Sequence, residues 1–132
     1  MSLDSVSQLG QGSNTNGYDT GFPVTAVYSL LYELGITANN IGFFHTSFSV
    51  LLVAENPQRL LLARKWLYPE VAKYYKTTVG AVERNICTII RNTWQLNRDA
   101  LERIAGCSLG EKPTSSQFIS ILYTYLQPRK LA

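Results

Sequence analysis

The sequence predicts an all-α fold, a compact six-helix domain that contains a helix-turn-helix and is preceded by a polar tail. Three observations support this class. Apolar residues recur at spacings of three and four along most of the chain after residue 22, which is the helical period. The breaks between these stretches carry helix caps and helix stops. With 45% hydrophobic and 16% charged residues, the 132-residue chain can bury the core of one domain.

The first 21 residues differ from the rest in composition. They are rich in Ser, Gly, Asn and Gln and poor in apolar residues, so they bury too little surface to fold alone. We therefore expect residues 1–21 to form a linker or tail and residues 22–132 to form the helical domain.

Two helices are expected before residue 56. PVTAVYSLLYELG ends at Gly35 and carries one stripe at helical spacing: Val24, Val27, Leu30, Leu31 and Leu34. ITANNIGFF is expected to connect this helix to the next. HTSFSVLLVAEN has β-branched residues typical of a strand, but its length and its helical neighbours favour a helix.

A third helix is expected to begin at Asn56-Pro57, with the asparagine as its cap and the proline in its first turn. Within PQRLLLARKWL, the residues expected to face the core are Leu60, Leu61, Ala63 and Leu67. Those expected to face water are Arg59, Arg64 and Lys65.

The remaining helices have clear boundaries. YPEVAKYYKT carries Pro69 in its first turn, and the long segment TVGAVERNICTIIRNTWQ has one apolar stripe: Val82, Ile86, Ile89, Ile90 and Trp94. Asn97 is expected to cap RDALERIAG, which ends at Gly106. TSSQFISILYTYLQ opens with a capping box of Thr114 and Gln117. Its expected stripe is Phe118, Ile121, Leu122 and Tyr125.

Residues 68–90 have the spacing of a helix-turn-helix. A small residue is needed where the two helices cross, and Ala72 supplies it, with Val71 and Tyr75 facing inward. Thr77 or Thr78 is expected to cap the second helix, which enters the core through Val82 and Ile86. Glu83 and Arg84 then point away from that stripe. Taken alone, the same spacing also fits two ordinary core helices.

Charge is distributed unevenly along the chain. Residues 1–58 contain four acidic residues and no Lys or Arg, whereas residues 59–132 contain all twelve basic residues and five acidic ones. The second part therefore has a net charge of +7, which favours a polyanionic partner.

Several classes of function lack the residues they need. No CxxC occurs and His45 is the single histidine, so neither a metal nor a cofactor is expected. No nucleophile–base pair, carboxylate pair or phosphate-binding glycine loop is present, which argues against an enzyme. Cys87 and Cys107 are expected to be reduced and mostly buried. With no membrane span and no secretory signal, the expected location is the cytoplasm.

Four segments carry a resemblance to a known family. LYPEVAKYYKTTVGAVER, AVERNI, TW and KPTSSQFI resemble the C-terminal effector domain of the sporulation initiation response regulator, the stage 0 sporulation protein A family. Order and spacing agree over about residues 24–127. The resemblance implies an all-helical bacterial domain that reads a short promoter box in double-stranded DNA, commonly as tandem copies of itself. It also implies contact with RNA polymerase sigma subunits.

The resemblance also assigns roles to individual residues. Glu83 and Arg84 match the family's base-reading pair, and their chemistry suits cytosine N4 and guanine O6/N7 respectively. Thr78 and Lys112 match positions suited to phosphate contact. The full set of base-reading candidates is Glu83, Arg84, Asn85 and Thr88. The phosphate candidates are Lys76, Thr78, Gly80, Arg91 and Lys112.

The chain departs from the family at four positions that would face DNA. The family has Ser and Arg where this chain has Gly80 and Ala81, and a further Arg and His where it has Cys87 and Thr88. The family's receiver domain also has no counterpart in these residues, so the chain is expected to be a fragment or a free-standing effector domain.

Our prediction is a sequence-specific DNA-binding transcription regulator without a receiver domain, not an enzyme. The alternative is a protein-interaction module of the same fold, which binds a regulator or a polymerase subunit and reads DNA weakly.

Overall fold

The computed structural model describes residues 22–128, so the predicted polar tail at residues 1–21 lies outside the described residues. Within residues 22–128 the chain forms seven α-helices and one 3-10 helix, and no strand. The elements are α2 (Val24–Glu33), α3 (Ile41–Glu55), η1 (Pro57–Leu62), α4 (Ala63–Trp66), α5 (Tyr68–Tyr75), α6 (Val79–Leu96), α7 (Arg98–Ala105) and α8 (Ser115–Leu126). The all-α prediction is confirmed, although this part of the chain has seven α-helices rather than six.

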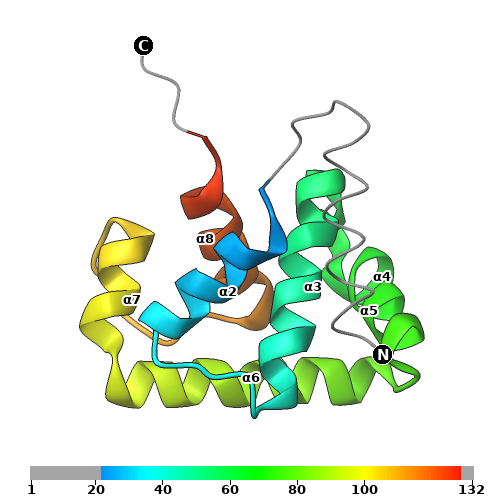
Figure 1. Cartoon of the computed structure of the whole chain (residues 1–132), viewed down its shortest axis with the longest axis horizontal. Helices are drawn as coiled ribbons and strands as arrows, with labels where there is room; N and C mark the ends of the chain where they lie inside the picture. Colours follow the sequence, from blue (N-terminus) through cyan, green and yellow to red (C-terminus); the bar gives the residue numbers. More distant parts are fainter. Residues whose placement is uncertain (1–21, 129–132) are drawn as a thin grey trace.

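Helix α6 lies along one side of the molecule (Figure 1). The short helices α4 and α5 lie near its N-terminal end, and α7 follows its C-terminal end. Helices α3 and α8 pack on the inner side of α6, and α2 packs on α3 and α8 to complete the body of the domain. One long face of α6 is therefore left free of these helices.

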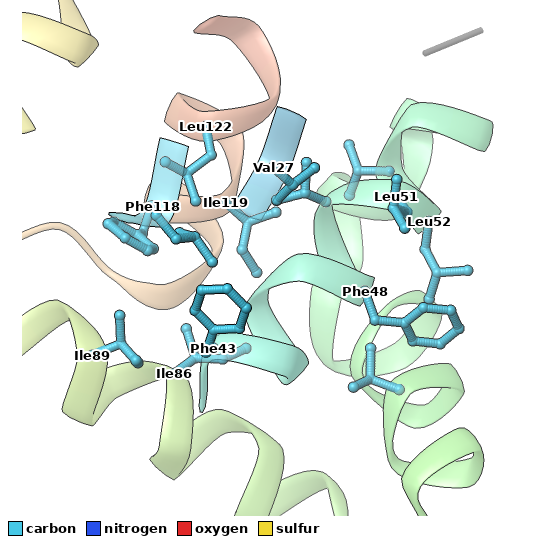
Figure 2. Close-up of a cluster of buried hydrophobic side chains, with 14 of the residues drawn as sticks. Val27, Phe43, Phe48, Leu51, Leu52, Ile86, Ile89, Phe118, Ile119 and Leu122 are labelled. Atoms are coloured by element: carbon cyan, nitrogen blue, oxygen red, sulfur yellow. The ribbon is translucent and has the colours of Figure 1, made fainter. Parts of the chain in front are cut away.

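Helix α3 is the centre of the core and packs against α2, α5, α6, α8 and η1. It is buried on nearly every side, because a helix that is apolar all round has to be surrounded by protein. In Figure 2, Phe43 of α3 lies between Ile86 of α6 and Ile119 of α8. The helix expected at HTSFSVLLVAEN is thus confirmed, in spite of its β-branched residues.

The start of α3 differs from the prediction, which placed residues 36–44 in a connector. The helix begins at Ile41, because the Asn40 side chain accepts a hydrogen bond from the Gly42 N–H at 2.9 Å and caps it. Gly42 also sets the crossing with α6. A Cβ at this position would lie 2.6 Å from both the Asn85 carbonyl oxygen and Ile89 Cγ1. The two helix backbones can approach this closely because residue 42 has no side chain.

The segment 57–67 is not one α-helix, which corrects the prediction. Its first six residues form a 3-10 helix, with three residues per turn. The side chains therefore point in other directions than an α-helix would give them. Leu61 is 73% exposed instead of facing inward, and Leu60 is only half-buried. Ala63 and Leu67 are buried as expected. Arg59 is half-buried rather than facing water, because its guanidinium donates to the Leu52 carbonyl at 2.7 Å.

The boundaries of α7 and α8 agree with the prediction, except that Asn97 does not cap α7 with its side chain. Its side chain instead donates to the Leu34 carbonyl at 3.0 Å, which ties α7 to the end of α2. Gly106 ends α7 with φ +80, and Thr114 and Gln117 form the predicted capping box of α8. Tyr125 was predicted to face the core from α8 but is partly exposed. Ile119, which was not in the predicted stripe, is fully buried.

Both cysteines are exposed, so the prediction of buried thiols is wrong. Cys87 lies on the side of α6 that turns away from the core, and Cys107 follows the end of α7. Among residues 22–128, no helix is long and apolar enough to cross a membrane. The same part of the chain has no cluster of metal-ligating side chains.

Candidate nucleic-acid interface

Helices α5 and α6 pack against each other and are joined by a turn of three residues, 76–78. The turn is closed by two backbone hydrogen bonds, from the Thr77 N–H to the Ala72 carbonyl at 2.9 Å and from the Lys76 N–H to the Lys73 carbonyl at 3.3 Å. This pair of bonds is a Schellman motif, which needs a left-handed residue just past the helix. Lys76 takes that conformation with φ 56, where glycine is the usual residue. The chain thus makes the compact helix-turn-helix that the spacing predicted.

The first helix is fixed in the core by small and apolar side chains. Val71 is fully buried and Ala72 is 5% exposed, so α5 can lie close to its neighbours. Tyr75 is half-buried, with its ring 5.0 Å from the His45 ring of α3. These contacts hold α5 as a support for the second helix.

The second helix begins with a side-chain cap. The Thr78 hydroxyl accepts a hydrogen bond from the Ala81 N–H at 3.0 Å, which confirms the predicted cap. The N–H groups of a helix's first turn have no acceptors within the helix, and they carry the positive end of the helix dipole. The start of α6 is exposed at Thr78 and Gly80, so a phosphate can approach it closely.

Helix α6 has two distinct faces. Its inner face is buried in the core and consists of Val82, Ile86, Ile89, Ile90 and Thr93. We call the opposite side the outer face, which consists of Gly80, Arg84, Cys87, Thr88 and Arg91. Each of these residues lies three or four positions from at least one other, so together they share one side of the helix. All of them are exposed except Thr88, which is half-buried.

The four base-reading candidates lie in different surroundings. Arg84 is exposed near the middle of the outer face. Thr88 lies beside it but donates its hydroxyl to the Arg84 carbonyl at 3.1 Å. Asn85 is half-buried on the flank that faces α3, where its side-chain nitrogen is 3.5 Å from His45 Nδ1. The Asn85 side chain is therefore turned toward the domain and away from the outer face.

Glu83 lies on the opposite flank, toward α4, and is half-buried. Its carboxylate forms an ion pair with the guanidinium of Arg64 in α4. Arg64 is exposed, as the sequence predicted, but its pairing with Glu83 was not predicted. No local signal could have found it, because the partners are 19 residues apart and meet only through the packing of α4 and α5.

Four of the five phosphate candidates lie on the outer face or in the turn next to it. Lys76 and Thr78 lie in the turn, while Gly80 and Arg91 lie on α6, and all four are exposed. Lys112 is also exposed, in the loop before α8. The start of α8 is tied to α5, since the Tyr68 hydroxyl donates to the Ser115 hydroxyl at 2.6 Å. Burial raises the pKa of the Tyr68 hydroxyl to about 12, so this donor stays protonated at neutral pH.

The loop that carries Lys112 is fixed by one carboxylate. Glu102 accepts a hydrogen bond from the Leu109 N–H at 2.7 Å, and Arg98 donates to the Leu109 carbonyl at 2.7 Å. The Leu109 N–H, and then Arg98, lower the pKa of Glu102, which keeps the carboxylate charged. The Arg98 guanidinium also stacks on the Trp94 ring at 4.0 Å, which joins the loop to α6.

His45 is a buried residue that supports the helix-turn-helix from within the core. It is 2% exposed and packs against Tyr75 and Asn85, so it lies beneath both helices of the helix-turn-helix. Burial lowers the pKa of its imidazole, which favours the neutral ring.

A comparison with protein families agrees with this geometry. Residues 27–126 match the family model described as the C-terminal part of sporulation initiation factor Spo0A. The match covers well over half of the chain and includes every helix from α3 to α8 in full.

Proposed function

The chain belongs to the family of sporulation initiation factor Spo0A C-terminal domains, which are DNA-binding transcription factor domains, and on that premise we propose how it reads DNA. In our proposal the domain binds double-stranded DNA sequence-specifically and regulates transcription, with the outer face of α6 in the major groove. The observation that carries this proposal is the position of Arg84. It is exposed on the free side of the second helix of a helix-turn-helix.

The proposed base contacts follow from side-chain chemistry. Arg84 can donate two N–H groups to O6 and N7 of one guanine. Glu83, on the flank of the same turn, can accept a hydrogen bond from the N4 amino group of a cytosine. Thr88 is a weaker reader, because its hydroxyl already bonds to the backbone. Asn85 can read a base only if its side chain leaves His45.

The proposed phosphate contacts would fix the helix in the groove. Lys76, Thr78 and the exposed backbone at Gly80 lie at the start of α6, while Arg91 lies about three turns further along the outer face. Lys112 would contact a phosphate from the loop before α8. Contacts of this kind give affinity and register but carry no sequence information.

One domain of this kind offers few hydrogen-bond donors to the bases. Cys87 stands on the outer face where a longer polar side chain would reach further, and Gly80 has no side chain. We therefore propose that tandem copies on neighbouring boxes, and contact with an RNA polymerase sigma subunit, raise the effective affinity on a promoter.

The same shortage of donors is the observation that favours a second function. Weakened DNA contacts at Gly80, Cys87 and Thr88 on the outer face, and at Ala81 beside it, could leave a domain that mainly binds proteins. Leu61, Leu62 and Trp66 are exposed on η1 and α4 and would supply an apolar contact surface.

A gel-shift titration with a pool of random-sequence duplexes over a salt series separates the two functions. Reading by this surface predicts binding whose affinity falls steeply as salt rises, because Lys and Arg displace cations from the phosphates. Duplex affinity that is negligible even at low salt, together with capture of a purified sigma subunit, would support the interaction module instead.

A further inference from the structure

Among the ion pairs of residues 22–128, one joins the helix-turn-helix to another part of the domain. Its partner outside the motif is Arg64. Its guanidinium extends from α4 to the Glu83 carboxylate on α6. The Arg64 side chain is 68% exposed, whereas that of Glu83 is 29% exposed. The pair therefore lies at the surface, at the edge of the face that we propose enters DNA.

Without a partner, Glu83 would be poorly suited to that position. A carboxylate beside the groove is repelled by the phosphates on both sides of it. A free glutamate side chain also samples several rotamers, and ordering it on binding costs conformational entropy. An arginine beside it removes both problems, since it neutralises the charge and fixes the carboxylate in one direction.

The surroundings leave Arg64 able to do more than hold Glu83. Both residues line a hollow of about 410 Å³ with Thr114, Ser115 and Ser116 at the start of α8. A guanidinium carries five N–H donors in a fixed fork, so pairing through Nη1 leaves donors for another acceptor. Arg64 can thus stay paired with Glu83 while it faces the DNA backbone.

We propose that Arg64 is a specificity-determining positioning residue, which orients and neutralises Glu83 so that this carboxylate reads one base pair. The inference rests on the proposed function, because it assumes that Glu83 faces DNA. Arg64 acts through Glu83, so its loss should relax the preference at the base pair that Glu83 reads and at no other.

Lys65 provides a matched control. It is the next residue in α4, is exposed, and carries the same charge. Replacing Lys65 by Ala removes one positive charge from the same short helix without removing the described partner of Glu83. An effect due only to charge near DNA would therefore appear in both variants.

The test is selection of binding sites from random duplexes by the wild type and by the variants Glu83→Ala, Arg64→Ala, Lys65→Ala and the double variant Arg64→Ala/Glu83→Ala. Glu83→Ala identifies the base pair concerned. Arg64→Ala should reduce discrimination at that same pair by about two- to fivefold, the range of a surface ion pair. Lys65→Ala should leave it unchanged, and Arg64→Ala should have no further effect on it in the Glu83→Ala background.

A conservative variant and a stability measurement guard against a general structural effect. Arg64→Lys keeps the charge and should retain part of the discrimination, and all variants should melt within a few degrees of the wild type by circular dichroism. If Arg64→Ala does not fold, Arg64→Gln replaces it.

The outcomes separate this inference from the proposed function. If the wild type selects no sequence, both are wrong. If the wild type selects a box and Arg64→Ala retains or sharpens the preference that Glu83→Ala loses, the role of Arg64 is wrong and DNA reading stands. The role of Arg64 is also wrong if Glu83→Ala selects the same base at every position as the wild type.

Discussion

The two faces of α6 have opposite relations to the rest of the domain. The inner face carries Ile86 and Ile89, which are almost completely buried against α3 and α8 (Figure 2). The outer face carries Arg84 and Arg91, both exposed. One helix therefore holds the domain together on one side and offers charge to a partner on the other. The comparison teaches that folding and binding can be changed separately within eighteen consecutive residues.

The largest expected effect is on the inner face. Ile86→Ala should lower the free energy of unfolding by about 2–5 kcal/mol, because it leaves a cavity where α6 meets α3. Urea denaturation measures this directly. The matched variant Cys87→Ala, next along the helix but on the outer face, should stay within about 0.5 kcal/mol of the wild type. Equal losses for the two variants would remove the distinction between the faces.

Arg84→Ala should show the reverse behaviour. It should leave the urea midpoint unchanged but cost about 1–3 kcal/mol of binding to the selected duplex and relax the preference at one base pair. Lys112→Ala is the control, since a phosphate contact should weaken all duplexes alike and reduce the salt slope by about 1. Equal losses on selected and random duplexes for Arg84→Ala would contradict the base-reading role.

The turn between the helices allows a smaller change that affects both properties. Lys76→Gly should raise the free energy of unfolding by about 0.5–1 kcal/mol, because glycine adopts the left-handed conformation without strain. It should also weaken binding to every duplex by removing a charge. Lys73→Gly, three residues earlier and inside α5, should instead destabilise the domain by about 1 kcal/mol. If Lys73→Gly also stabilised the domain, the gain from Lys76→Gly could not be attributed to the left-handed backbone conformation of residue 76.

The smallest effect is the pH dependence due to His45. Since burial lowers the pKa of the folded imidazole below 6.5, the unfolded chain takes up a proton first as the pH falls. Stability should be constant above about pH 7, decrease as the pH falls through about 6.5, and level off below the folded pKa. Urea midpoints between about pH 8 and pH 5 measure this decrease. If stability instead increased as the pH falls from about 8 to 5, the folded protein would favour the charged imidazole and the account would be wrong.

The sequence predicted the regular parts of the domain because their signals are local. Helical period, the caps at Asn56 and Thr78, and the stops at Gly35 and Gly106 each depend on a few neighbouring residues. These signals were enough to place the long helix α6 and its inner face. They failed at residues 57–62, where a 3-10 turn changes the phase of the side chains and exposes Leu61.

The candidate site was predictable only where it depends on one helix. Arg84 lies two residues from both Val82 and Ile86, and therefore on the opposite side of the helix from these buried residues. Its exposure could thus be predicted from the sequence. The surroundings of Glu83 and Asn85 could not, because Arg64 and His45 reach them from α4 and α3 through tertiary packing. The exposure of Cys87 could have been read from the same spacing as Arg84, since it lies three residues further along the helix.

The most direct test of the central claim is a nuclear magnetic resonance titration of the wild-type domain with its selected duplex. Binding by the outer face predicts that the largest amide shifts occur at Gly80, Arg84, Thr88 and Arg91, with smaller ones at Lys76 and Lys112. Shifts confined to α2, α7 and the C-terminal half of α8, with α6 unaffected, would contradict it.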